Sequence, residues 1–106
     1  MPNTRTRSRF IVLLQSIKDG VEVGHHEVWS RHSSLKAAGE EGDRLIVANL
    51  VTRGTYLRKP TPRETSIARR FRKIERSMAY AGGSIFYAVI DTEEGKSYSI
   101  HEARRG

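Results

Sequence analysis

The stretch SRFIVLLQSIKDGVEVGHHEVWSR, residues 8–31, decides the fold class. Its first half is an apolar run of the kind found in β-strands, and its second half returns with a mixture of polar and apolar residues. Asp19 and Gly20 stand between the halves and form a residue pair preferred in two-residue type I′ turns. The sequence therefore predicts a β-hairpin with strands over 8–17 and 21–31.

A two-residue turn would also fix how the two strands pair. Lys18 would lie opposite Val21, and counting back along both strands sets Phe10 opposite Trp29. We therefore expect Trp29, the only tryptophan, in the core beside Phe10. The alternative is an exposed tryptophan that serves as a stacking or interface anchor.

A second hairpin is expected near the C-terminal end of the sequence. Residues 85–92 form an apolar strand, residues 93–95 form a turn in which Gly95 supplies the left-handed conformation, and residues 96–103 return as a polar strand. Residues 1–8 and 104–106 are expected to be flexible basic tails.

Two helices are expected between the hairpins. The first is capped by Ser33 or Ser34 and continues with apolar residues at helical spacing, while Gly39 and Gly42 point to close packing. Its C-terminal end, 45–51, is rich in β-branched residues and could run into an extended segment through 52–54.

The second helix has the clearer start. Thr61, Pro62 and Glu64 combine an N-cap, a proline at the first helical position and a capping box. An apolar stripe follows at helical spacing, and two glycines end the helix at 82–83. The stripe consists of Ile67, Phe71, Ile74 and Met78.

These elements predict one α+β domain over residues 9–103, in the order β-β-α-α-β-β. Its sheet is four-stranded and mainly antiparallel, is made of the two hairpins, and packs against the two helices. The first and third strands are apolar on both faces, whereas two helices cover only one. We therefore expect a homodimer, or contact with a partner, through the open sheet face.

Composition narrows the class of protein further. The chain has 106 residues and no cysteine, which indicates a single domain without disulfides or thiolate metal sites in a reducing compartment, so we expect the cytoplasm. The longest early apolar run, 10–14, is far shorter than the roughly 20 residues of a membrane span. The four histidines lack metal-ligand spacing, and no nucleophile, phosphate-loop or paired-carboxylate motif is present. We expect no enzymatic activity, cofactor, bound metal or membrane partner.

Charge is the most informative feature of the sequence. The net charge is +7, and the segment 53–76 carries all of that excess because it holds nine basic residues and only two acidic ones, Glu64 and Glu75. Tyr80 lies just beyond this segment and is counted with it as a candidate binding residue. The nine basic residues are Arg53, Arg58, Lys59, Arg63, Arg69, Arg70, Arg72, Lys73 and Arg76.

The second predicted helix places Arg69, Arg72, Lys73 and Arg76 opposite its apolar stripe. An ordinary exposed helix mixes charge signs, because like charges three or four residues apart repel. We therefore expect a small nucleic-acid-binding module, for DNA or RNA, that contacts phosphates. The alternatives are a protein-interaction module, such as a small inhibitor or accessory factor of phage or mobile-element type that docks on an acidic or nucleic-acid-binding surface, and an ordinary solvated face.

Overall fold

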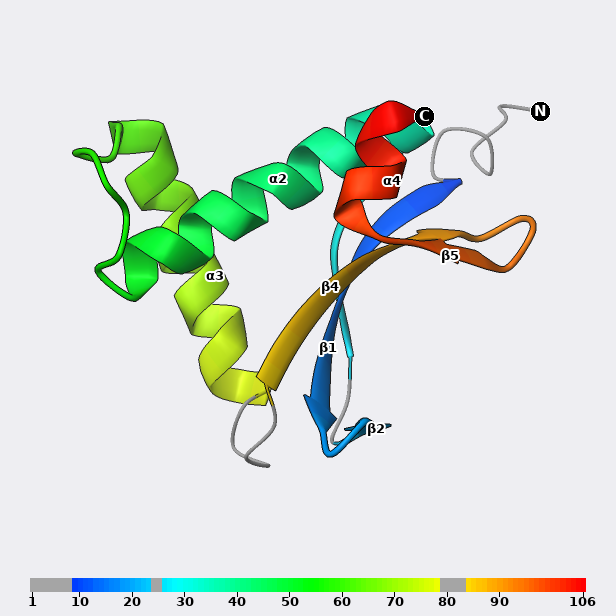
Figure 1. The fold of residues 1–106 in the computed structure, drawn as a ribbon, viewed down its shortest axis with the longest axis horizontal. Helices are drawn as coiled ribbons and strands as arrows, with labels where there is room; N and C mark the ends of the chain where they lie inside the picture. The colour runs from blue at the N-terminus through cyan, green and yellow to red at the C-terminus, as the bar shows by residue number, and fades with distance from the viewer. Residues whose placement is uncertain (1–8, 24–25, 79–83) are drawn as a thin grey trace.

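The computed structural model describes residues 9–23, 26–78 and 84–106. Within them, the α+β fold consists of one curled antiparallel sheet and three helices (Figure 1). The elements in chain order are β1 (Phe10–Lys18), β2 (Val21–Glu22), β3 (Glu27–His32), α2 (Leu35–Thr52), α3 (Pro62–Met78), β4 (Ser84–Asp91), β5 (Lys96–Tyr98) and α4 (Ile100–Arg105).

β1 is the central strand of the sheet. It pairs with β4 on one side in an unbroken register from Phe10–Asp91 to Ile17–Ser84, and β5 continues the sheet beyond β4. On its other side β1 pairs first with β2 and then with β3. Alternate residues of β1 and β4, among them Val12, Leu14 and Val89, join the three helices in one core.

The first hairpin is confirmed at its turn. Asp19 and Gly20 have φ values of 54° and 77°, as a type I′ turn requires, and Lys18 pairs with Val21. The expected register fails farther along, because Phe10 pairs with His32 and not with Trp29. An irregularity between Val12 and Leu13 adds a residue on the β3 side, and the stretch between β2 and β3 adds more.

Trp29 is nevertheless a core residue, at 2% exposure. It falls at the irregularity, and its ring meets Phe71 of α3 edge to face, with 6.5 Å between centroids. Its indole N–H donates to Glu41 Oε2 at 2.9 Å. The core interpretation is therefore right, although the aromatic neighbour is Phe71 and not Phe10.

Both helix starts follow the sequence signals. Ser34 caps α2 by accepting from the Ala37 N–H, and α2 stays helical to Thr52 with Arg53 in a helical conformation at its C-cap, so the extended segment expected through 52–54 is wrong. Burial of Leu45 and Ala48 in the core outweighs the low helix propensity of their β-branched neighbours. At the start of α3, Thr61 and Glu64 form the expected capping box.

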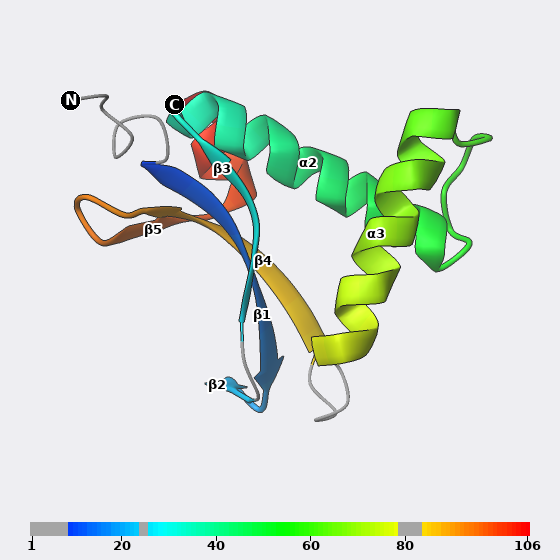
Figure 2. The same cartoon turned by 180° about the vertical axis from the view of Figure 1, so that it is seen from behind.

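The apolar stripe of α3 faces inward as expected. Phe71 and Met78 are fully buried, and Ile67 and Ile74 pack partly buried against the core. Figures 1 and 2 show α3 at the edge of the molecule. The connector from α2 to α3, residues 53–61, lies beside the first turns of α3.

The strand expected over 96–103 is wrong in its second half. β5 ends at Tyr98, and Ser99 and Glu102 then form a capping box that begins α4. Arg104 and Arg105, placed in a tail by the sequence, form the last turn of α4. The observed order of elements is thus β-β-β-α-α-β-β-α, so the expected order holds only in part, and the sheet has five strands within the described residues where four were expected.

α4 packs on α2 where α2 lacks side chains. A Cβ at Gly39 would lie 2.5 Å from the Arg104 nitrogen, and one at Gly42 would collide with the Ile100 side chain. The two glycines therefore provide the close packing that their positions indicate.

The sheet face away from the core is apolar, and the described helices pack on the other side. Ile11 and Leu13 lie on it beside Ile90 and Ala88 of β4 and are each only 9% exposed, whereas Phe86 is 53% exposed. The expectation that a second copy or a partner covers this face stays a prediction. Light scattering of the purified protein tests the homodimer, and a strict monomer at high concentration contradicts it.

Candidate functional site

α3 presents four basic side chains on its outer side. Arg69, Arg72, Lys73 and Arg76 are all exposed, and together with Ser77 they line one shallow surface hollow. They lie there because the Phe71 side of α3 is fixed in the core, which turns the opposite side of the helix to solvent.

A second hollow extends this surface toward the connector. Lys59 lines it together with two prolines and with Thr65, Ser66 and Arg69 of α3. Thr65 and Ser66 are not among the binding residues predicted from the sequence. Helical spacing does place Ser66 on the same side as Arg69 and Lys73. We call the surface formed by five of these basic residues the α3 basic face: Lys59, Arg69, Arg72, Lys73 and Arg76.

No carboxylate neutralises this face. Within residues 9–23, 26–78 and 84–106, no Asp or Glu lies at ion-pairing distance from a side chain of the α3 basic face. The two acidic residues of the basic segment are engaged elsewhere, since Glu75 pairs with Arg53 and Glu64 with Arg58, each at 3.1 Å. The outer surface of α3 is therefore positive along its whole basic stretch.

Repulsion within the face is a cost to the folded protein. Arg69 and Lys73, like Arg72 and Arg76, are spaced i,i+4 on one helix, where a like-charge pair destabilises by about 0.2–0.5 kcal/mol. A bound polyanion removes this cost and gains the attraction of every cation on the face.

Three of the nine candidate cations make internal contacts. The Arg70 guanidinium lies 4.0 Å from the centroid of the Trp29 ring and donates to the Trp29 carbonyl oxygen at 2.8 Å. Arg53 also donates to Asn49 Oδ1, and Arg58 stacks on Tyr56. The structure thus separates these three from the α3 basic face.

Of the two remaining candidates, the structure places only Arg63, which lies apart from the α3 basic face. Arg63 is exposed, but it lines a different pocket of about 410 Å³ between α2 and α3, which also contains Arg44, Arg58 and Glu64. Tyr80 lies outside the described residues.

Glu64 ties the connector to the start of α3. Its carboxylate accepts from the Thr61 N–H at 2.8 Å and from the Tyr56 hydroxyl at 2.9 Å. These bonds lower the pKa of Glu64, and desolvation raises that of Tyr56. The contacts fix the segment that carries Lys59 close to the first turn of α3.

The histidines make ordinary local contacts. His32 bonds to Ser30 Oγ at 2.7 Å rather than to its neighbour Ser33, and burial lowers the pKa of His32. His26 pairs with Glu22, and His25 lies outside the described residues. Across the described part of the chain, no group of three or more His, Asp or Glu side chains is placed to hold a metal.

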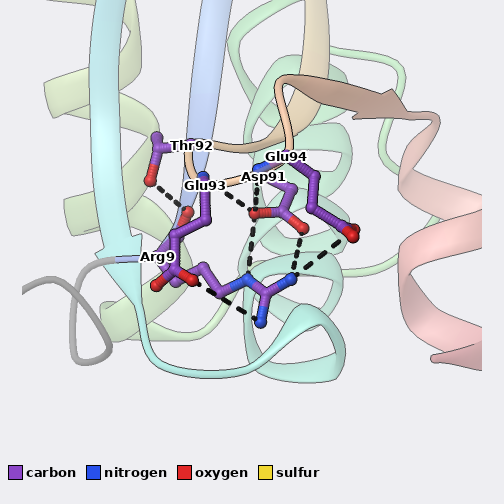
Figure 3. Close-up of polar contacts among 5 residues, drawn as sticks. All are labelled: Arg9, Asp91, Thr92, Glu93 and Glu94. Carbon is purple, nitrogen blue, oxygen red and sulfur yellow. Dashed lines mark hydrogen bonds and ion pairs between the residues drawn. The ribbon is translucent and has the colours of Figure 1, made fainter.

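Arg9 lies within ion-pairing distance of three carboxylates, those of Asp91, Glu93 and Glu94 (Figure 3). Its Nε and Nη2 donate to the two carboxylate oxygens of Asp91 at 2.9 and 2.8 Å, and Asp91 is buried. Asp91 Oδ1 also accepts from the backbone N–H groups of Glu93 and Glu94. The Arg9 guanidinium holds the pKa of Asp91 far below its usual value, and Asp91 raises that of Arg9.

Comparison with known proteins finds no match among family models, curated proteins or solved structures. No helix in the described residues is long and apolar enough to cross a membrane. The geometry and charge of the α3 basic face are therefore the features of this chain that indicate a function.

Proposed function

We propose that this protein is a non-enzymatic nucleic-acid-binding module that contacts phosphates through the α3 basic face. One observation carries the proposal: five exposed cations share one side of the molecule with no carboxylate partner among the described residues, while both acidic residues of the segment pair elsewhere. A phosphate backbone supplies the regularly spaced negative charge that such a surface lacks.

The chemistry of the side chains supports the same partner. Three of the five cations are arginines, whose planar fork forms two parallel hydrogen bonds to a phosphate. Thr65 and Ser66 add hydroxyl groups beside Arg69, and hydroxyls commonly contact phosphate oxygens. The Phe71 side of α3 holds the helix on the core, so the cations project from a fixed support.

The experiment that tests the proposal measures binding of the purified protein to mixed DNA and RNA at low salt, followed by a salt titration. We expect binding whose logarithmic affinity falls linearly with the logarithm of salt concentration, at about 0.9 per contacted phosphate on a duplex. Absence of binding at low salt contradicts the proposal and favours the protein-interaction module, in which the same charges dock on an acidic surface of a larger protein.

A further inference from the structure

The shape of the α3 basic face distinguishes between kinds of nucleic acid. α3 has 17 residues, which corresponds to a helix about 25 Å long. Among the described segments, Figures 1 and 2 show the connector from α2 on the outer side of α3, near its first turns, and no other helix or strand there. Most of α3 is thus free to approach a ligand along its length.

The cations are arranged as a central row with flanks. Arg69, Lys73 and Arg76 follow one another at i, i+4 and i+7, so they form one row along the outermost side of α3. Arg72 lies to one side of the row, where it lines a small hollow with Val51 and Thr52 of α2. Lys59 lies beyond the first turn, on the connector.

Among the described residues, the α3 basic face has no exposed aromatic ring of the kind that binds single strands. Proteins that hold single-stranded nucleic acid without sequence preference stack its bases on exposed aromatic side chains. In the described part of the chain, no aromatic residue lines the hollows around Arg69, Arg72 or Lys73. The exposed ring of Phe86 lies on the sheet face away from the helices.

Groove dimensions separate DNA from RNA duplexes. The major groove of B-form DNA is about 12 Å wide and admits an α-helix about 10–12 Å across. The major groove of A-form RNA is too deep and narrow for side chains to read. A rigid helix with a cationic row and cationic flanks therefore fits a DNA duplex better than an RNA duplex.

We propose, on the basis of the nucleic-acid-binding function above, that α3 enters the major groove of duplex DNA. Arg69 and Arg76 in the central row reach guanine edges, where an arginine fork donates to O6 and N7. Lys59 and Arg72 contact the phosphates that flank the groove.

The first experiment compares three probes of the same mixed, GC-rich sequence at one salt concentration: duplex DNA, single-stranded DNA and duplex RNA. Fluorescence anisotropy is expected to give a dissociation constant for duplex DNA about tenfold or more below the other two. Equal or tighter binding of single strands or duplex RNA overturns the groove inference and leaves nucleic-acid binding standing. Binding of none of the three overturns the proposed function itself.

The second experiment asks whether guanine edges are contacted. Replacing guanine by 7-deazaguanine in the duplex removes the N7 acceptor and leaves the phosphates unchanged, so affinity is expected to fall about fivefold or more. The double variant Arg69→Lys/Arg76→Lys keeps both charges but loses the bidentate forks. Because a lysine still donates to guanine but without the fork, the variant is expected to distinguish the guanine duplex from the 7-deazaguanine duplex less than the unmodified protein does, with a similar salt dependence.

A matched control variant, Arg31→Lys/Arg105→Lys, changes two exposed arginines away from α3. It is expected to retain the sensitivity to 7-deazaguanine, and circular dichroism checks that both variants fold. If the unmodified protein binds the two duplexes equally, α3 does not contact guanine edges and the inference fails.

Discussion

Two sites that contain arginine, the one around Arg9 and the α3 basic face, differ in how their positive charge is balanced. At Arg9, one guanidinium meets a buried carboxylate in a bidentate pair, and the nearby Glu93 and Glu94 add further negative charge. On the α3 basic face, five cations share a surface with no carboxylate partner in the described residues. An arginine that is paired with a carboxylate of the same chain stabilises the fold. A cluster of cations without such carboxylates indicates a negatively charged partner.

The largest expected effect is the loss of nucleic-acid binding when the charges of the α3 basic face are removed. The variant Arg69→Gln/Arg72→Gln/Lys73→Gln/Arg76→Gln leaves the buried stripe of α3 intact and removes its internal repulsion, so folding should survive. Nucleic-acid binding should collapse, and the salt-dependence slope should fall by about 3 to 4. Anisotropy titrations measure binding, and thermal unfolding checks the fold.

A control with the same change in net charge decides whether position matters. Lys18, Arg31, Lys36 and Arg105 are exposed away from α3, and their joint replacement by Gln should leave most of the affinity. If both quadruple variants lose binding equally, general charge and not the α3 basic face attracts the ligand.

The opposite side of the same helix should control stability. Phe71 is fully buried between Trp29 and Tyr87, and Phe71→Ala should lower the free energy of unfolding by about 3–5 kcal/mol. Denaturant unfolding measures this loss. A small loss here, together with unfolding of the charge-neutralised variant, would mean that α3 faces the other way.

Low pH should weaken the ion pair between Arg9 and Asp91. The pKa of Asp91 is lowered in the folded protein, so its pairing with Arg9 stabilises fully above the unfolded pKa of about 3.9 and is lost progressively as pH falls below it. The free energy of unfolding should therefore fall below about pH 4. Glu64 and Glu102, whose pKa values are also lowered, act in the same direction.

Comparison with Asp91→Asn isolates the contribution of the pair with Arg9. The variant should be less stable at neutral pH and should lose less stability on acidification than the unmodified protein. Parallel pH profiles for the two proteins would show that the pairing does not contribute to acid sensitivity.

The smallest effect should separate Arg70 from its neighbour Arg69. Arg70 stacks on Trp29 and donates to its carbonyl, so Arg70→Gln should cost about 1–2 kcal/mol of stability. Arg69→Gln should change stability by less than about 0.5 kcal/mol and act on binding alone. Denaturant unfolding of both variants measures the difference, and equal losses would contradict the division of the nine cations drawn from the structure.

Local signals in the sequence were sufficient for several elements. Asp19 and Gly20 fix their turn through their own backbone preferences, and Thr61 with Glu64 fixes the start of α3. The signal for α4 was also present, because Ser99 and Glu102 have capping-box spacing. The same residues also fit the polar pattern of the strand expected over 96–103, so the helix was not predicted.

Other features depend on contacts between distant parts of the chain. The pairing of Phe10 with His32 follows from where the irregularity in β3 falls, and no local signal marks that place. Arg9 and Asp91 are 82 positions apart, so their pairing has no sequence signature. The basic segment was recognised from its composition, but its division into paired and unpaired cations required the placement of Glu75 against Arg53.

The close approach of α4 to Gly39 and Gly42 has an evolutionary consequence. Any larger residue at either position must displace the backbone of α4 or the Ile100 side chain, so almost no substitution there is neutral for folding. The four cations that α3 contributes to the α3 basic face have no such restriction, because their side chains are exposed. Selection for the fold and selection on the proposed binding face thus act on different codons, and substitutions on that face can change its charge without destabilising the packing of α4 on α2.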